Sequence, residues 1–102
     1  NTVTSLEHDR DWFQKIKSEM PKNVNIHYQQ LIYGEHYSKF SNTIGMKFDI
    51  VIVDGRDRVN CLKSAIDSLT DEGVIVLDDS ERKAYSAGID NLISQGFKKI
   101  DF

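Results

Sequence analysis

The sequence predicts an α/β domain with a three-layer, mostly parallel sheet and helices on both faces. Segments rich in β-branched residues alternate with segments whose apolar residues recur at helical spacing. The stretch Phe48–Gly55 (FDIVIVDG) is almost continuously apolar, which is typical of a strand covered on both faces. Several of the strands end in acidic or amide residues, at the edge where open α/β sheets bind ligands.

Composition narrows the class of protein. The 102 residues form one small domain (1–102), and the net charge of −3 supplies no basic patch for nucleic acid. A lone cysteine, Cys61, excludes an internal disulfide and fits a reducing compartment, so we expect a cytoplasmic protein. No segment resembles a signal peptide or a membrane span, so no membrane partner is expected, and a homo-oligomer is left open.

The first segments predict a strand, a helix and a second strand. Thr2–Leu6 reads as a short buried strand, and Asp9 or Asp11 can cap the helix that follows it. Pro21 closes that helix, because the residue before a proline avoids the α region. Val24–Tyr28 then alternates apolar and polar residues, as an edge strand does. The apolar helix positions are Trp12, Phe13, Ile16 and Met20.

An irregular or short helix is expected within Gln29–Lys47, bracketed by Gly34 and Gly45. Its aromatic and aliphatic residues are spaced by four, three and four positions. This spacing would pack them onto the sheet. They are Tyr33, Tyr37, Phe40 and Ile44.

Two further helices flank another predicted strand, Val74–Leu77. Cys61 lies beside the apolar stripe of the first helix and is expected to be a small packed side chain. Thr70–Gly73 reads as a turn, Gly96 as the C-terminal cap of the last helix, and Phe97–Phe102 as the start of another strand. The apolar stripes are Val59, Leu62, Ala65, Ile66 and Leu69 in the first helix, and Tyr85, Ile89, Leu92 and Ile93 in the second.

Polar residues at the strand ends form the candidate site. Glu7 follows the first strand, where a carboxylate commonly accepts hydrogen bonds from ribose hydroxyls. The alternative is that Glu7 caps the next helix. His8, Gln29 and Gln30 could flank an adenine ring, or could be ordinary surface groups.

Three aspartates suggest a second kind of site at the same edge. Asp54, Asp78 and Asp79 follow neighbouring predicted strands, and carboxylate oxygens are the ligands that Mg²⁺ prefers. A bound cation would lower the pKa of a hydroxyl nucleophile. Alternatively, Asp54 caps the next helix and Asp79 the last one.

These motifs resemble the class I S-adenosylmethionine-dependent methyltransferases, from the second strand of that Rossmann-like fold onward. VTSLEHD is similar to the second strand with its ribose-binding acid, FDIVIVDG to the fourth strand, and LTDEGVIVLDDS to the turn and fifth strand. Glu72 stands where the family often has a glycine. In the metal-dependent O-methyltransferases of this family, aspartates matching Asp54, Asp78 and Asp79 in type are metal ligands.

The family's first strand and glycine-rich loop would precede Asn1, and none of the standard phosphate-binding glycine motifs occurs in the chain. In the family, that first strand lies between the second and the fourth. We therefore expect a C-terminal portion of a Rossmann-like methyltransferase domain, incomplete at its N-terminus and inactive alone. The alternatives are that another chain fills the central position or that the second and fourth strands pair directly.

The resemblance implies methyl transfer from S-adenosylmethionine to a small-molecule or sugar hydroxyl. Asp54 is then the expected catalytic base and also lies at the cofactor, and Arg56 or Arg58 could bind an anionic group of the substrate. The main alternative is a non-catalytic Rossmann-like interaction module. A receiver domain with Asp54 as phosphoacceptor and half of a dehydrogenase are weaker alternatives.

Overall fold

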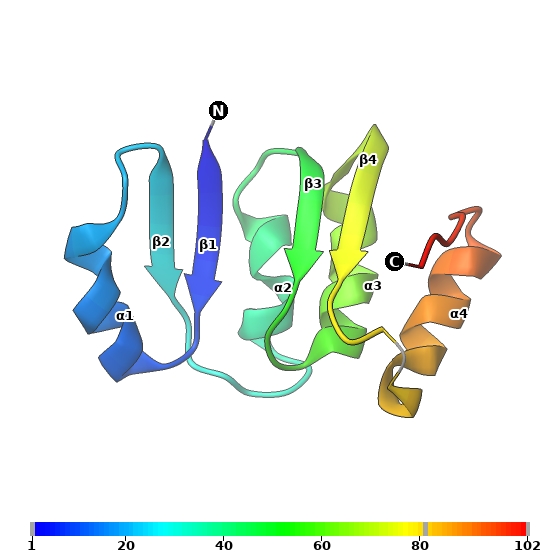
Figure 1. Ribbon diagram of the computed structural model, residues 1–102, viewed down its shortest axis with the longest axis horizontal. Helices are drawn as coiled ribbons and strands as arrows, with labels where there is room; N and C mark the ends of the chain where they lie inside the picture. The colour runs from blue at the N-terminus through cyan, green and yellow to red at the C-terminus, as the bar shows by residue number, and fades with distance from the viewer. Residues whose placement is uncertain (1, 81, 102) are drawn as a thin grey trace.

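The computed structural model describes residues 2–80 and 82–101, and it confirms the α/β class (Figure 1). Strands and helices alternate along most of the chain, and two short 3₁₀ segments, Lys17–Glu19 and Lys83–Tyr85, accompany α1 and α4. The strands are β1 (Val3–Glu7), β2 (Val24–Tyr28), β3 (Phe48–Val53) and β4 (Leu69–Leu77). The helices are α1 (Arg10–Ile16), α2 (His36–Thr43), α3 (Arg58–Ser68) and α4 (Ser86–Ser94).

The described strands form two separate parallel pairs rather than one continuous sheet. In the first pair, β1 runs beside β2 with Glu7 opposite Tyr28. In the second, β3 runs beside β4 with Val53 opposite Leu77. β1 and β3 face each other across the gap between the pairs, and all four strands point the same way (Figure 1). Direct pairing of these two strands, one of the expected alternatives, is therefore not what the structure shows for residues 2–80 and 82–101.

The predicted turn at Thr70–Gly73 lies inside β4 as an irregularity of the strand. Leu69 is opposite Phe48, and Val74 is opposite Ile50. The four residues Thr70–Gly73 therefore lie opposite the single residue Asp49. The Thr70 hydroxyl donates to Asp49 Oδ1 at 3.1 Å. A Cβ on Gly73 would come within 2.6 Å of a Leu69 methyl group, so only glycine fits where the chain bends.

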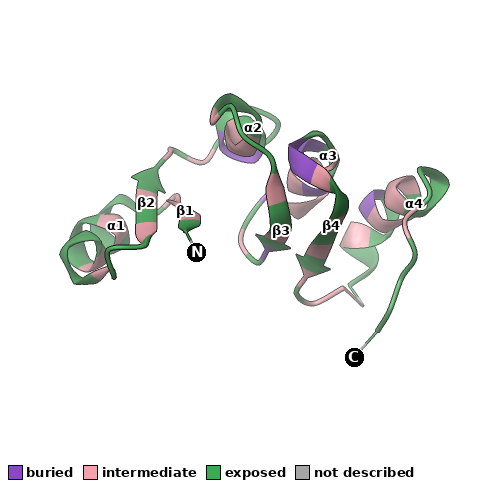
Figure 2. Ribbon diagram, turned by 90° about the horizontal axis from the view of Figure 1, so that it is seen from above, coloured by how far each residue is buried: buried purple, intermediate pink, exposed green. Residues whose placement is uncertain are grey.

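Helices cover one face of the β3–β4 pair and leave the other bare. Figure 2 shows α2 and α3 on the same side of these strands, with α4 beside them. On the bare side, Ile50 is 61% exposed and Ile52 is 67% exposed. The prediction that Phe48–Gly55 is covered on both faces is therefore wrong for the described chain. The exposed apolar face consists of Ile50, Ile52, Val74 and Val76.

The first helix, α1, has an aspartate N-cap as predicted, but its Trp12 side chain is not buried. Asp9, rather than Asp11, is the N-cap, and its Oδ1 accepts the Trp12 N–H at 3.0 Å. Trp12 itself is 49% exposed, contrary to its expected place in the apolar stripe. Its ring lies beside the Lys15 ammonium, 5.7 Å away, because α1 covers only a two-stranded sheet and leaves this position in solvent.

The last helix ends as the sequence predicts, but residues 97–101 after it form no strand. Gly96 has φ +97°, and its N–H donates to Ile93 O, while the Phe97 N–H donates to Leu92 O. Ile93 is 49% exposed rather than inward, because it lies at this end of the helix. Residues 97–101 are irregular, so the expected strand is absent there, and Phe102 lies outside the described residues.

Buried side chains are concentrated in the second half of the chain. Leu62 is fully buried, and Val53, Ala65, Leu69 and Tyr37 pack into the same half. No residue in the range 2–36 is buried to the same degree. Among the described helices, none has the length and apolar character needed to cross a bilayer.

Candidate functional site at the strand ends

The carboxyl ends of the four strands lie at one edge of the molecule (Figure 1). Glu7 is the last residue of β1, and Gln29 follows β2. Asp54 follows β3, and Asp78 follows β4. The structure thus places most of the predicted site residues at a common edge, although they come from two separate strand pairs.

Glu7 is partly exposed, and one of its oxygens orders the turn after β1. Its Oε2 accepts the Asp9 N–H at 2.8 Å and lies 3.6 Å from His8 Nδ1. Asp9, and not Glu7, is the N-cap of α1. Glu7 contributes only the hydrogen bond that it accepts from the Asp9 N–H in the turn before the helix. A carboxylate held in this way presents acceptor oxygens at the strand tip, with its side chain 22% exposed.

His8, Gln29 and Gln30 differ in how they are held. The Gln29 N–H donates to the Glu7 carbonyl at 3.1 Å, which continues the β1–β2 pairing by one bond. The His8 ring packs edge-on against Tyr37 with centroids 5.7 Å apart. Gln30 is exposed. Gln29 therefore lies beside Glu7, whereas the His8 ring packs against α2.

Tyr37 joins the two strand tips, a role that the sequence did not reveal. It is 8% exposed, and its hydroxyl lies against the loop after β3, beside Gly55 and the Arg56 backbone. Burial raises the pKa of the Tyr37 phenol, the Arg56 backbone lowers it, and the charge of Glu7 acts in the same direction as burial. The four-three spacing of aromatic residues indicated an inward side chain but could not identify its distant partners.

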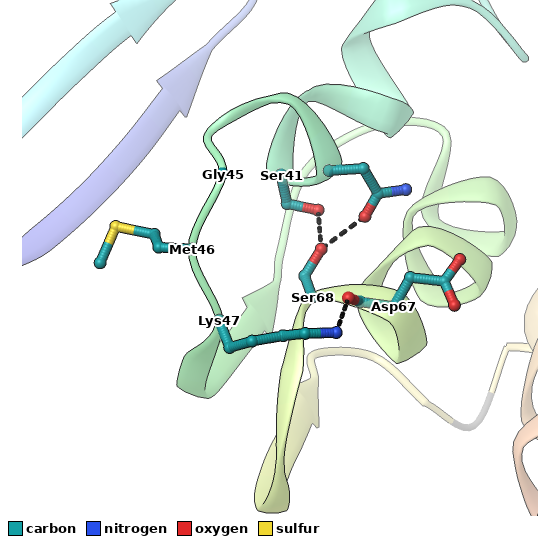
Figure 3. Close-up of a pocket in the computed structure, with 7 residues that line it drawn as sticks. Ser41, Gly45, Met46, Lys47, Asp67 and Ser68 are labelled. Atoms are coloured by element: carbon teal, nitrogen blue, oxygen red, sulfur yellow. Dashed lines mark hydrogen bonds between the residues drawn. The ribbon is translucent and has the colours of Figure 1, made fainter.

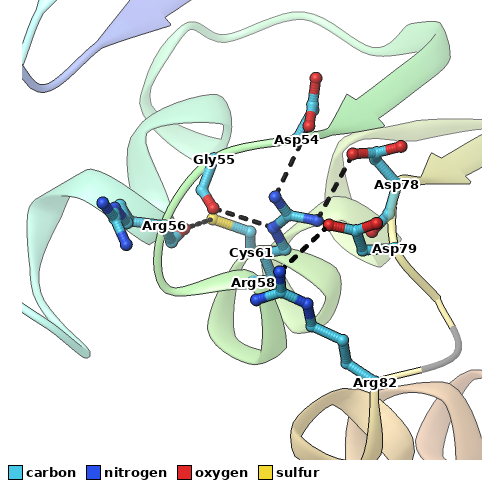
Figure 4. Close-up of polar contacts among 8 residues, drawn as sticks. All are labelled: Asp54, Gly55, Arg56, Arg58, Cys61, Asp78, Asp79 and Arg82. Carbon is cyan, nitrogen blue, oxygen red and sulfur yellow. Dashed lines mark hydrogen bonds and ion pairs between the residues drawn. The ribbon is translucent and has the colours of Figure 1, made fainter.

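Arg58 occupies the space between the tips of β3 and β4 (Figure 4). Its Nη2 lies 3.5 Å from Asp54 Oδ1 and its Nη1 lies 4.0 Å from Asp78 Oδ2. It also donates to the carbonyl of Gly55 at 2.8 Å and to the carbonyl of Asp78. The guanidinium further lies over the Tyr85 ring, 5.3 Å from its centroid. Arg58, whose side chain is 11% exposed, therefore ties both strand tips to the segment leading into α4.

As arranged here, the three predicted metal ligands do not fit a magnesium site. Asp54 and Asp78 flank the Arg58 cation, and Asp79 forms its ion pair with Arg82 at 3.5 Å. Within residues 2–80 and 82–101, no three His, Cys, Asp or Glu side chains are grouped so that they could hold a metal. Magnesium binding stays a prediction, and it would require Arg58 to move.

Asp57 is a structural anchor beside the site that the sequence did not identify. It is 6% exposed and has φ +51°. Its Oδ2 accepts the Gly34 N–H and its Oδ1 accepts the Asn60 side-chain amide, both at 2.8 Å. The residue therefore anchors the loop that crosses from β2 to α2 onto the start of α3.

Cys61 is a packed side chain, as expected. Its thiol lies 3.6 Å from the Arg56 carbonyl. Burial raises the pKa of the Cys61 thiol to about 11, and the nearby Asp57 charge adds to this effect. A thiol with such a pKa is almost fully protonated near neutral pH and is a poor nucleophile.

One cavity lies away from the strand ends, where α2 and α3 finish (Figure 3). It has a volume of about 310 Å³. Its polar groups bind one another, since Ser68 Oγ lies 2.8 Å from Ser41 Oγ and Lys47 Nζ donates to the Asp67 carbonyl at 2.7 Å. We therefore place the candidate site at the strand ends, where charged side chains reach solvent.

Comparisons with known proteins add no assignment. Scans of protein-family models, of curated proteins and of solved structures found no match to this chain.

Proposed function

We propose that the chain forms part of a Rossmann-like S-adenosylmethionine-dependent methyltransferase domain that methylates a small-molecule or sugar hydroxyl. The observation that carries the proposal is a shared edge: Glu7 ends β1 there, and Asp54 directly follows β3, a strand of the same direction. Ligands of open α/β sheets bind at the carboxyl ends of the strands.

The proposal treats the two strand pairs as parts of one larger sheet. Unpaired strand edges present backbone N–H and C=O groups that can pair with another strand. β1 and β3 offer such edges across the gap seen in Figure 1, so one more parallel strand would join the pairs. A helix over the exposed apolar face of β3 and β4 would then complete three layers.

In this domain, Glu7 would hold the two ribose hydroxyls of the cofactor, and Gln29 beside it would contact the adenine. A carboxylate suits this role because its two oxygens can accept two hydrogen bonds at once. The Asp9 N–H fixes the Glu7 side chain through Oε2, which orients it before any ligand binds. When bound, S-adenosylmethionine supplies an activated methyl group.

Asp54 would accept the proton of the substrate hydroxyl. Its side chain is 61% exposed, and the Arg58 guanidinium 3.5 Å away holds it from the protein side. Arg56, two positions further along the chain, is also exposed and would receive an anionic group of the substrate. Most of the rate enhancement would come from aligning the hydroxyl with the methyl group.

A titration with S-adenosylhomocysteine tests the proposal, with unfolding as the readout and the longest natural form of the protein as the sample. At a ligand concentration 100 times Kd, we expect the free energy of unfolding to rise by about 2.7 kcal/mol. Glu7→Gln should lose most of this gain, because an amide has only one acceptor oxygen. Glu19→Gln, in the exposed 3₁₀ segment after α1, is the matched control and should keep it.

An interaction module is the second candidate, and the exposed apolar face of β3 and β4 favours it. Contiguous exposed apolar residues commonly mark protein-binding surfaces. If saturating S-adenosylhomocysteine leaves the unfolding transition unchanged, the methyltransferase proposal is wrong and the interaction module is preferred.

A further inference from the structure

The two strand pairs share no backbone ladder among the described residues, so within this part of the chain other contacts hold their tips apart. The helix α2 lies between them. On one side it packs against α3. On the other side, Tyr37 and Phe40, one turn apart, contact the rings of His8 and His27, with centroids 5.7 Å and 5.2 Å apart.

Of these contacts, the one made by Tyr37 reaches both tips. Its ring meets His8, directly after β1, and its hydroxyl lies against the loop after β3, where it faces Gly55 and the Arg56 backbone. The side chain is 8% exposed, so it has little room to adopt another position.

The glycine after β3 is required by this contact. A Cβ on Gly55 would lie 2.8 Å from the Tyr37 hydroxyl oxygen, closer than real Cβ contacts come. Gly55 does not have a positive φ, so its backbone conformation would accept alanine. The Tyr37 hydroxyl therefore packs directly against Gly55, in the space that the side chain of any other residue would occupy.

We propose that Tyr37 is a positioning residue that sets the separation of the β1 and β3 tips and so the width of the ligand-binding edge. The effect on ligand binding rests on the proposed function, whereas the effect on tip separation does not. Phe40 and the Asp57–Gly34 hydrogen bond still hold α2 and the crossing loop when the Tyr37 hydroxyl is removed. Tyr37→Phe should therefore stay folded.

The test measures the distance between the two halves by electron paramagnetic resonance. Spin labels are placed at the exposed positions 14 in α1 and 63 in α3, in a chain carrying Cys61→Ala. Tyr37→Phe should broaden or shift the distance distribution. Tyr33→Phe removes the hydroxyl of a tyrosine that is 65% exposed and should leave the distribution unchanged. Identical distributions for both variants would overturn the proposal.

A double-mutant comparison tests the fit between Tyr37 and Gly55 independently. Gly55→Ala should shift the distribution when Tyr37 is present and shift it much less in the Tyr37→Phe background, where no hydroxyl meets the new methyl group. Equal shifts in both backgrounds would also overturn the proposal.

Binding of S-adenosylhomocysteine separates this inference from the proposed function. If both hold, Kd rises on the order of tenfold in Tyr37→Phe, because misplaced binding groups lose affinity and rate steeply. If the parent protein does not bind, the proposed function fails, while the distance distributions still decide the role of Tyr37.

Discussion

The two halves of the chain have the same local plan and differ in what stabilises them. Each contains a parallel strand pair joined by a helix, β1–α1–β2 in one and β3–α3–β4 in the other. In the second half, α3 packs against both α2 and α4 and buries Leu62 completely. In the first half, only α1 and two ring contacts from α2 cover the strands, and no side chain is buried to that degree.

The difference shows that a βαβ unit becomes a core only when further helices pack on it. A parallel pair of strands with one helix leaves most of its surface in water, so by itself it has little stability against unfolding. We infer that the first half depends on its contacts with α2 and with the loop ending at Gly34.

Leu62→Ala should have the largest effect. It removes a fully buried side chain from the contact of α3 with α4, and such truncations cost about 2–5 kcal/mol. Leu6→Ala, in β1, is the matched truncation in the first half and should cost about 1 kcal/mol, since its side chain is only partly buried. Urea unfolding measures both, and equal losses would show that the two halves are stabilised alike.

Asp57→Ala should cost about 1–3 kcal/mol, because it leaves the Gly34 N–H and the Asn60 amide without their acceptor. The same substitution should speed hydrogen exchange of the Gly34 amide. Asp71→Ala is the control at an exposed position in β4. If exchange at Gly34 is equally fast in both variants, Asp57 does not anchor the crossing loop.

Asp9→Ala should cost about 1 kcal/mol as the loss of a helix N-cap. Asp11→Ala removes only a charge in the first helical turn, worth about 0.3–1 kcal/mol. Thermal unfolding at low salt compares them. A larger loss for Asp11 would mean that the cap is misassigned.

Cys61 gives a pH-dependent test in the second half. Its pKa rises from 9.0 to about 11 on folding, so the unfolded chain ionises first. Its contribution to stability should be complete below pH 9 and should decline as pH rises through 11. The rate at which iodoacetamide alkylates Cys61 should rise with pH with an apparent pKa near 11 in the folded chain. In urea, the same rate should show the ordinary pKa of a thiol. If the folded and unfolded chains give the same pH profile, the Cys61 thiol is exposed to solvent.

Local patterns predicted the fold well wherever one segment determines its own structure. The strand at Phe48–Val53, the Asp9 cap and the Gly96 terminus follow from neighbouring residues. The division into two strand pairs and the exposure of Trp12 could not be predicted, because each depends on which distant elements pack there.

The candidate site also combines features that local sequence predicts with features that depend on distant residues. The strand-end position of Glu7 and Asp54 follows from strand direction, which the alternation of strands and helices predicts. The contacts of Arg58, Tyr37 and Asp57 join residues far apart in sequence, so they required the structure. For this reason the sequence could suggest a metal between Asp54 and Asp78 where the structure places a guanidinium.

The shared edge of Glu7 and Asp54 is the claim on which the account depends, and paramagnetic relaxation measures it directly. A nitroxide at position 54, in a chain carrying Cys61→Ala and Asp54→Cys, should broaden the amide resonances of His8 and Gln29 at the strand ends. The amides of Thr4 and Asn25, near the opposite ends of β1 and β2, should be affected less. The reverse pattern would place the two carboxylates at different edges and contradict the proposed site.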